Sequence, residues 1–404
     1  MSDTIRPMAS EENPYAPPVT SDPAGDLPDV SPDRRKRLVR SLWPLYLLTL
    51  LRSAAVMLWF RFWFTVPDQR QMAEVHGYSM LGGMVLAVPL VALLGDRRAA
   101  RVVLLAGLIL MAASLVASPL LSAGLVLPAI TMTLRHVGST AATMIIVAYL
   151  LRSVTVHGVY VAFFLLQVAE GLGGTAKYLG LLLDRPIYPL LAAAGALLLG
   201  TLTLLRLPAP DEATLPQSVP DPLSQPPLRL LRALALLALL EAMSVLGGLI
   251  ELVDGFHDTG SLVAQLHQLP LLLGLLLPFL AFRRRWAPGR LALGGMLTGA
   301  AGALVTSASR LGFGVPLAAT GRSIFVLGFR VLFHIATPAL LRQQLPLPRL
   351  ARWYSLRWLF WAPLQAATTL PLRLMQDNVT AIIPFAALAM LLLVPALWWV
   401  TREQ

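Results

Sequence analysis

Residues 76–120 read HGYSMLGGMVLAVPLVALLGDRRAARVVLLAGLILMAASLVASPL, which is two apolar runs on either side of a short charged connection. A helix of about 20 apolar residues is needed to cross the ~30 Å hydrocarbon core of a bilayer. The same alternation recurs along the whole chain, of whose 404 residues 56% are hydrophobic and 13% are charged. The sequence therefore predicts an all-α membrane protein that crosses the bilayer many times.

The apolar runs predict 12 transmembrane helices, at residues 39–60, 76–95, 102–120, 125–151, 159–183, 187–205, 230–253, 261–282, 291–308, 315–341, 353–374 and 380–400. Twelve crossings put both chain ends on one side of the membrane. That side collects 20 lysines and arginines, whereas the other holds five: Arg61, Arg70, Arg185, Arg310 and Arg373. Because basic residues accumulate in cytoplasmic loops, we expect both termini in the cytosol and the chain in the cell inner (cytoplasmic) membrane.

Two polar, proline-rich stretches divide the chain. Residues 1–38 have the composition of a disordered cytosolic tail, with a partner-binding tail as the alternative. Residues 208–227 read PAPDEATLPQSVPDPLSQPP, which is typical of a linker. We therefore expect an N-terminal six-helix bundle over residues 39–206, a cytosolic linker over 207–228 and a C-terminal six-helix bundle over 229–404.

The two halves share landmarks at an offset of 190 residues, which places Gly138 on Gly328. The same offset places Leu150-Leu151-Arg152 on Leu340-Leu341-Arg342. Duplicated halves of this kind form one plan of membrane transporters, with the substrate site between them. The sequence therefore predicts two pseudo-symmetric bundles.

Two short motifs resemble those of the major facilitator superfamily. Residues 94–101 read LGDRRAAR, where Asp96, Arg97 and Arg101 match the superfamily's loop Gly-x-Leu-x-Asp-Arg-x-Gly-Arg-Arg. The fourth helix carries Arg135-His136-Val137-Gly138, which is similar to the superfamily's Arg-x-x-Gln-Gly without its glutamine. The resemblance implies a secondary transporter with alternating access, a substrate or coupling role for Arg135, and a gate formed by the loop residues. From its chemistry, Asp96 is expected to pair with Arg97 or Arg101, or to cap the N-terminus of a neighbouring helix.

Ionisable residues inside the predicted helices are candidates for substrate binding or coupling, because each costs about 2.5–3.5 kcal/mol at the bilayer centre and usually faces a cavity or a partner. The candidates are Arg135, Glu170, Lys177, Arg52, Glu241, Arg330 and His267. Lys177 also stands about where antiporters of the superfamily have a proline, so proton exchange does not follow from this segment. For Arg135, the alternative is a structural partner of Glu170 or of another carboxylate.

Arg52 and Glu241 occupy near-equivalent positions in the first and seventh helices. They are expected to meet across a central cavity or, alternatively, to pair within their own bundles. Glu170 and Lys177 lie two turns apart on one face of the fifth helix. His267 and His334 are candidates to carry protons near neutral pH, with neutral, hydrogen-bonded histidines as the alternative.

The intramembrane cations outnumber the clear intramembrane acids, Glu170 and Glu241. Since an unpaired charge in a low-dielectric site is costly, the sequence predicts a solute with an anionic group. The first hypothesis is a secondary active transporter of a small organic solute, anionic or amphiphilic, working as a proton-coupled exporter, that is, an antiporter. The alternatives are a transport-inactive relative that acts as a membrane sensor or assembly factor, and a membrane-embedded lipid-modifying enzyme.

The enzyme hypothesis is the weaker one, because the six histidines are scattered without metal-ligand spacing. The absence of a Walker-type phosphate loop agrees with a secondary transporter, which needs no ATP site. We expect a monomer among membrane lipids whose partners are a small-molecule substrate and protons. No cofactor, no metal and no nucleic acid partner is expected.

Overall fold

The structure is a computed structural model that describes residues 42–63, 69–96, 99–120, 125–176, 187–208, 227–255, 269–308, 315–374 and 379–402. The expected N-terminal tail and most of the expected linker lie outside the described residues. So do three candidate residues of the sequence analysis, Arg97, Lys177 and His267.

Helices make up both halves of the described chain. The first half contains α2 (Trp43–Trp63), α3 (Gln69–Leu94), α4 (Ala100–Leu120), α5 (Val126–Ser153), α6 (Gly158–Gly174) and α8 (Ile187–Thr201), which the 3₁₀ turn η1 (Leu202–Arg206) extends. The second half contains α10 (Pro227–Gly255), α12 (Leu269–Arg283), α13 (Pro288–Ala308), α14 (Val315–Arg330), the π-helical turn η4 (Val331–Ala336), α15 (Thr337–Gln344), the 3₁₀ turn η5 (Leu347–Arg349), α16 (Leu350–Leu374) and α17 (Val379–Thr401). Each of the 12 predicted helices overlaps one of these segments, so the predicted all-α fold is confirmed.

Length and apolar composition explain why these segments are helical and where they stop. Nine helical segments of the described residues are long and apolar enough to cross a bilayer, and α6 is a shorter apolar helix of 17 residues. With no water to satisfy backbone polar groups in hydrocarbon, a spanning segment forms its own hydrogen bonds as a helix. The tenth predicted helix is one continuous path made of α14, η4 and α15.

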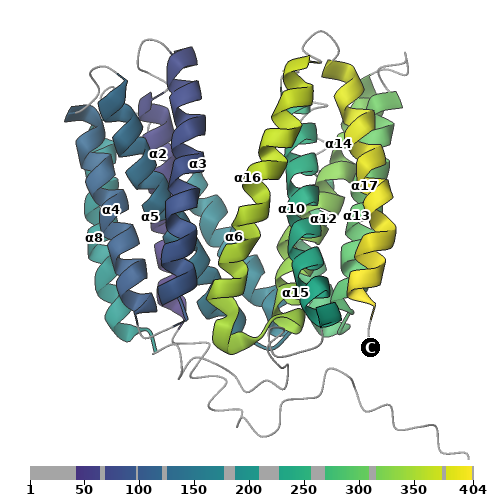
Figure 1. Cartoon of the computed structure of the whole chain (residues 1–404), viewed down its shortest axis with the longest axis horizontal. Coiled ribbons are helices and arrows are strands. Elements are labelled where there is room, and N and C mark those ends of the chain that lie inside the picture. The colour runs from purple at the N-terminus through teal and green to yellow at the C-terminus, as the bar shows by residue number, and fades with distance from the viewer. Residues whose placement is uncertain are drawn as a thin grey trace, which may run out of the picture.

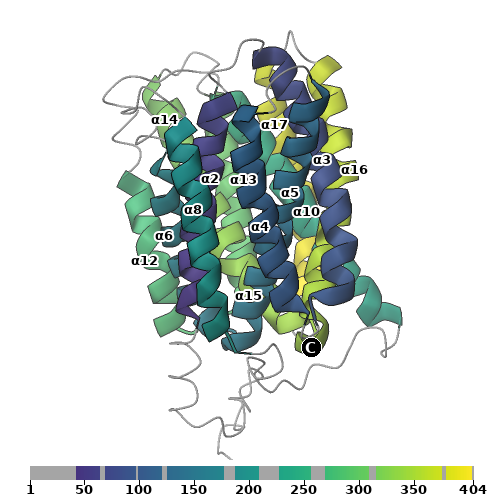
Figure 2. The same ribbon diagram turned by 90° about the vertical axis from the view of Figure 1, so that its left-hand side faces the viewer.

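The helices gather into two bundles, α2 to α8 and α10 to α17, which stand side by side in Figure 1. Figure 2 shows that the helix axes of both bundles run roughly along the same line. The same neighbours recur in both bundles. In the first bundle, α2 packs against α6 and α8. In the second bundle, the equivalent helix α10 packs against α16 and α17. Likewise α4 packs against α5 and α8, as α13 packs against α14 and α17. The predicted pseudo-symmetry is therefore present in the packing.

A pair of glycines marks a very close helix contact in each bundle. A Cβ atom on Gly138 of α5 would lie 2.3 Å from the carbonyl oxygen of Gly107 on α4. A Cβ atom on Gly328 of α14 would lie 2.2 Å from the backbone nitrogen of Gly299 on α13. Because small residues let helices approach closely in membranes, the offset that pairs Gly138 with Gly328 reflects one shared helix contact.

One end of the molecule is rich in arginine, and we call it the basic end. It is where α3, α5, α12 and α15 finish and where the helices that follow them begin, at the bottom of Figure 1. The C-terminal end of α17 also lies there. The described arginines near this end are Arg101, Arg152, Arg206, Arg232, Arg283, Arg284, Arg285, Arg290, Arg342, Arg349, Arg352 and Arg402.

We expect Gly138→Ala to lower the free energy of unfolding by about 1–3 kcal/mol, because the facing backbone of Gly107 has to move to admit a methyl group. Gly195→Ala on α8 is the matched control, since nothing lies within 4 Å of its added Cβ. The control should keep its melting temperature or raise it slightly, as alanine is the better helix former. Thermal unfolding of the purified variants in detergent measures both. Equal melting temperatures for the two variants would contradict the close approach.

Candidate functional site

An ion pair joins the first and fifth helices of the N-terminal bundle. Arg52 on α2 places Nη2 3.1 Å from Oε1 of Glu170 on α6, and its Nη1 donates to Oγ of Ser139 on α5 at 3.2 Å. Ser53 Oγ donates to the backbone oxygen of Glu170 at 2.8 Å. These contacts come from three helices, so they fix the pair in the bundle. We call Arg52, Glu170 and Ser139 the central pair site.

The central pair site is partly open. The Glu170 side chain is 54% exposed, whereas that of Arg52 is 11% exposed. Glu170 lies 12 residues beyond the start of α6 at the basic end, which is about 18 Å along a helix. A carboxylate at this depth is costly against lipid. The exposed edge of Glu170 is therefore expected to face water between the bundles rather than hydrocarbon.

Arg135 lies one helical turn from Ser139 on α5, and it is 1% exposed. Its guanidinium carbon is 3.9 Å from the centroid of the Trp59 ring and 5.4 Å from that of Phe60. Its Nη2 lies 2.8 Å from Nε2 of His136. Within the described part of the chain, no carboxylate pairs with Arg135 and its Nε has no hydrogen-bond partner.

A second histidine completes this cluster. Nε2 of His136 is 3.2 Å from Nδ1 of His76 on α3, and the two rings are 4.8 Å apart. The His76 ring also lies 5.0 Å from Phe60 and 5.7 Å from Trp59, whose Nε1 is fixed by a 3.0 Å hydrogen bond to Ser118 Oγ. We call Arg135, His136, His76, Trp59 and Phe60 the arginine–histidine cluster. It holds three helices together, α2, α3 and α5.

Sequence reasoning missed this cluster. It treated the histidines as scattered, because His76 and His136 are 60 residues apart. The signal that links them is the close packing of the second and fourth helices, α3 and α5. The alternative for Arg135, a structural pairing with Glu170, is not observed, because Arg52 holds that carboxylate and an aromatic ring covers Arg135.

A second ion pair lies in the C-terminal bundle. Nε of Arg357 on α16 pairs with Oε1 of Glu241 on α10, and Glu241 is 1% exposed. Arg52 and Glu241 thus each pair inside their own bundle, and the expected meeting across the cavity is not observed. The physical reason is that each charge finds its partner on a directly adjacent helix. The first and fifth helices and the seventh and eleventh helices carry equivalent ion pairs with reversed charge order.

Polar contacts join the two bundles at the basic end. Arg152 on α5 pairs with Oδ1 of Asp96, and its Nε donates to the carbonyl of Leu347 at 3.0 Å. Asp96 also accepts hydrogen bonds from the backbone nitrogens of Ala351 at 2.8 Å and Arg352 at 3.0 Å. It therefore caps the N-terminus of α16, which is the second of the two expectations for its carboxylate. Asp96, Arg152 and the start of α16 form what we call the basic-end clasp.

The other half of the duplication contributes a different contact. Nε of Arg342 donates to the carbonyl of Val154 at 2.9 Å, which mirrors the contact of Arg152. At the offset of 190 residues, the position of Asp96 is taken by Trp286, whose carbonyl accepts a 2.7 Å hydrogen bond from the Tyr160 hydroxyl near the start of α6. The C-terminal copy thus keeps the contact without a charge. Arg101, also expected in the gate, donates to the carbonyl of Leu207 on its own bundle.

The remaining described candidates lie in the tenth helix. Arg330 is the last residue of α14, and His334 follows in the π-helical turn η4. Both side chains are half-buried. π-helical turns inside α-helices are frequent at functional sites, so this turn marks the tenth helix as a place where a side chain can be redirected.

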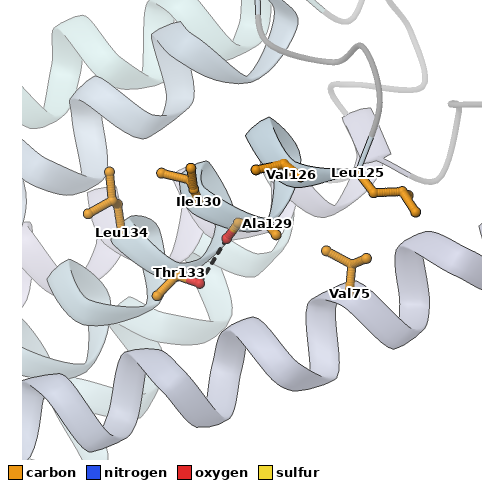
Figure 3. A pocket seen from close by; sticks show the side chains of 7 residues that line it. All are labelled: Val75, Leu125, Val126, Ala129, Ile130, Thr133 and Leu134. Atoms are coloured by element: carbon orange, nitrogen blue, oxygen red, sulfur yellow. Dashed lines mark hydrogen bonds between the residues drawn. The ribbon is translucent and has the colours of Figure 1, made fainter.

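The groove shown in Figure 3 is a poor site for a polar solute. It lies between α3 and α5, at their ends remote from the basic end, and is lined by Val75, Leu125, Val126, Ala129, Ile130, Thr133 and Leu134. Its hydroxyl group, that of Thr133, is bound to the carbonyl of Ala129 at 2.8 Å. Such a lining suits a lipid chain. Among the described residues, no group of three or more metal-ligating side chains is present either.

The two ion pairs should differ in their effect on stability. Glu241→Gln leaves Arg357 without its partner in a buried setting, so we expect a loss of about 3–5 kcal/mol in the free energy of unfolding. Glu170→Gln is the matched control and should cost less than about 1 kcal/mol, because that carboxylate is largely exposed. Thermal unfolding of both variants measures the difference. Adding Arg357→Gln to Glu241→Gln should restore part of the loss; equal losses in both single variants would contradict the assignment.

Comparison with known proteins concerns the overall architecture of the chain. No protein-family model and no curated protein sequence matches the chain. Solved structures do match. The proton:xylose symporter XylE bound to 6-bromo-6-deoxy-D-glucose is 13% identical with a TM-score of 0.71, covering 90% of this chain and 95% of that one.

Two further structures agree. A bacterial homologue of the iron transporter ferroportin, in its outward-facing state, is 15% identical with a TM-score of 0.67 over 90% of this chain and 100% of that one. The human organic anion transporter TETRAN is 16% identical with a TM-score of 0.58 over 89% and 99%. At these identities the likeness concerns the fold. The chain therefore has the fold of the major facilitator superfamily, as its loop motif and its fourth-helix motif predicted.

Proposed function

We propose that this chain is a secondary active transporter that moves a small organic solute across the cytoplasmic membrane by alternating access. One observation carries the proposal: the central pair site holds a partly exposed Glu170 and a guanidinium deep along the helices of a two-bundle fold. A protein that only needed to fold would gain little from an exposed charge at that depth, since intramembrane charges are costly and mark solute pathways. The fold supports it, because a two-bundle arrangement places a solute site between its halves.

The basic end is taken to be the cytosolic end, with both termini there, because basic residues accumulate in cytoplasmic segments. The clasp then closes the cytosolic side. With the clasp closed, the structure would correspond to the half of the proposed transport cycle in which the central pair site is shielded from the cytosol. Opening toward the cytosol would require Asp96 to release both Arg152 and the N-terminus of α16.

The solute is proposed to carry an anionic group. In the N-terminal bundle, two described guanidinium groups, those of Arg52 and Arg135, lie near one described carboxylate, that of Glu170. A second anion would balance the remaining cation, whose burial is otherwise unfavourable. Lys177, Arg330 and His267 stay candidates for the same role. Proton-coupled export is the proposed working mode.

A screen of purified protein against metabolite anions and drugs should identify solutes that raise its melting temperature, because a ligand that binds the folded state stabilises it by mass action. Uptake of each hit is then measured in proteoliposomes. We expect Arg52→Gln to lower uptake at least tenfold, whereas Arg206→Gln at the exposed basic end should leave it unchanged. The proposed solute class would be contradicted if a lipophilic cation is transported while organic anions are not transported and do not inhibit its uptake.

The same variants separate transport from the alternatives. A double substitution of Arg135 and Glu170 should abolish uptake while the protein stays folded. If the protein is an assembly factor or a sensor, the wild type should show no uptake. The double variant should then lose the proteins that co-purify with the wild type.

The clasp makes a separate prediction that uses the absence of cysteine from the sequence. A single cysteine at Leu347, which is fully buried between the bundles, reports opening of the basic end through its rate of maleimide labelling. Asp96→Asn removes the charge that holds Arg152, so we expect labelling to accelerate about tenfold, which corresponds to a shift of ~1.4 kcal/mol. A cysteine at the exposed Leu205 is the control, and its rate should not change. An unchanged rate at position 347 would show that Asp96 does not hold the clasp closed.

A further inference from the structure

The end of α17 meets the start of α13 at the basic end of the molecule. A Cβ atom on Gly289, in the first turn of α13, would lie 3.1 Å from Cβ of Thr401, the last residue of α17. Arg290 directly follows Gly289, and Arg402 directly follows Thr401, so both arginine side chains start at this helix contact. Both are exposed. We call Arg290, Arg402 and Trp398 the α13–α17 corner.

Aromatic rings hold arginines on two sides of the end of α17. The guanidinium carbon of Arg402 lies 5.0 Å from the centroid of the Trp398 ring, and its backbone nitrogen donates to the Trp398 carbonyl at 2.8 Å. Arg232, near the start of α10, has its guanidinium carbon 5.2 Å from the centroid of the Trp399 ring. A guanidinium group that stacks on a ring keeps the N–H donors in its own plane, where they remain available to an anion.

The charge of the corner is not balanced by the described part of the chain. The carboxylates whose side chains the structure describes are those of Asp96, Glu170 and Glu241, and each pairs with an arginine elsewhere. Arg290 and Arg402 therefore form a positive surface without a described counter-charge. Such a surface attracts anions.

An exposed apolar stripe runs along α17 to this corner. Its members follow one another at three or four positions, which places them on one face of the helix: Phe385, Leu388, Leu392, Pro395 and Trp398. Figure 1 shows α13 and α17 at the side of the C-terminal bundle that is remote from the N-terminal bundle, so the stripe faces hydrocarbon. Leu392, which is 80% exposed, precedes Arg402 by ten residues, about 15 Å along a helix.

The order of groups along α17 matches the order of groups in a phospholipid. An acyl chain needs apolar surface, the interface favours an aromatic ring, and the phosphate favours a cation. The stripe, Trp398 and Arg402 follow one another in this order. The duplication does not repeat the corner, because the offset of 190 residues places Arg290 on Ala100, which is fully buried.

We propose that the α13–α17 corner binds an anionic phospholipid, with the phosphate at Arg290 and Arg402 and an acyl chain along the apolar stripe of α17. The site lies apart from the central pair site, and the proposal does not depend on transport. With the basic end in the cytosol, as proposed above, the lipid belongs to the cytoplasmic leaflet, whose anionic lipids attract basic segments. The bound lipid would link the start of α13 to the end of α17.

Binding of phosphatidylglycerol to the full-length protein in detergent tests the site. Native mass spectrometry during a lipid titration gives the dissociation constant of the first bound lipid. We expect Arg290→Gln and Arg402→Gln each to weaken binding about fivefold, and the double variant about 25-fold, because each arginine near an anionic headgroup contributes separately. The two substitutions lie on different helices and at exposed positions, and equal melting temperatures in lipid-free detergent verify that the fold is kept.

The double variant Arg206→Gln/Arg283→Gln is the matched control. It removes the same net charge from two other exposed arginines of the basic end, of which Arg206 also stacks on a tryptophan, Trp43, at 5.8 Å. Its affinity for phosphatidylglycerol should equal that of the wild type. Equal losses in the corner variant and in this control would overturn the proposal, because the lipid would then respond only to the net charge of the basic end.

Two reference ligands identify the chemistry that the corner recognises. Phosphatidylcholine with the same acyl chains has no net charge, and glycerol phosphate has the charge without the chains. Both should bind at least about tenfold more weakly than phosphatidylglycerol, and the double variant Arg290→Gln/Arg402→Gln should lose this preference over phosphatidylcholine. Glycerol phosphate that binds as tightly as phosphatidylglycerol would mean that the corner takes a soluble anion, which would overturn the lipid assignment.

Discussion

The cost of charge in a medium without water governs this structure. Every intramembrane charge whose contacts are described is held by a neighbour: Arg52 by Glu170, Arg357 by Glu241, and Arg135 by an imidazole and two aromatic rings. Such pairs add little net stability, because bringing two charges out of water costs about as much as their attraction returns. What they add is specificity. Each joins one particular pair of helices, so the arrangement of the bundles depends on them.

The duplication is visible in packing and broken in chemistry. Both bundles bring their third and fourth helices together at glycines, and both carry an ion pair between equivalent helices. The charge order of that pair is reversed, however, and the position of Asp96 is taken in the second half by Trp286, whose carbonyl oxygen accepts from a hydroxyl group. The basic end is therefore joined by a carboxylate in one half and by a neutral carbonyl group in the other. The packing of the fold is duplicated, but the chemistry of this contact is not.

The helices could be predicted from the sequence because hydrocarbon thickness imposes a length that composition alone reveals. The capping role of Asp96 could also be predicted, because a carboxylate in a basic loop at a helix end is stabilised either by an arginine or by a helix N-terminus. The partners of Arg52 and Glu241 were not, because they depend on which helices are adjacent, and adjacency is decided by packing. The contact of His76 with His136 was missed for the same reason. Lys177, His267 and Arg97 lie outside the described residues, so their roles stay predictions.

The burial of Arg135 changes how its motif is understood. A cation that lined an open path would be available to a solute at once, whereas Trp59 covers this guanidinium and His136 accepts from it. The exposed charge near Arg135 is that of Glu170, which pairs with Arg52. Arg52 also donates to Ser139, which lies one helical turn from Arg135 on α5. In the proposed transport cycle, a solute anion that arrives there would compete with Glu170 for Arg52. The buried Arg135 would then act on the solute through its electric field, because Trp59 and His136 occupy the positions next to its guanidinium group.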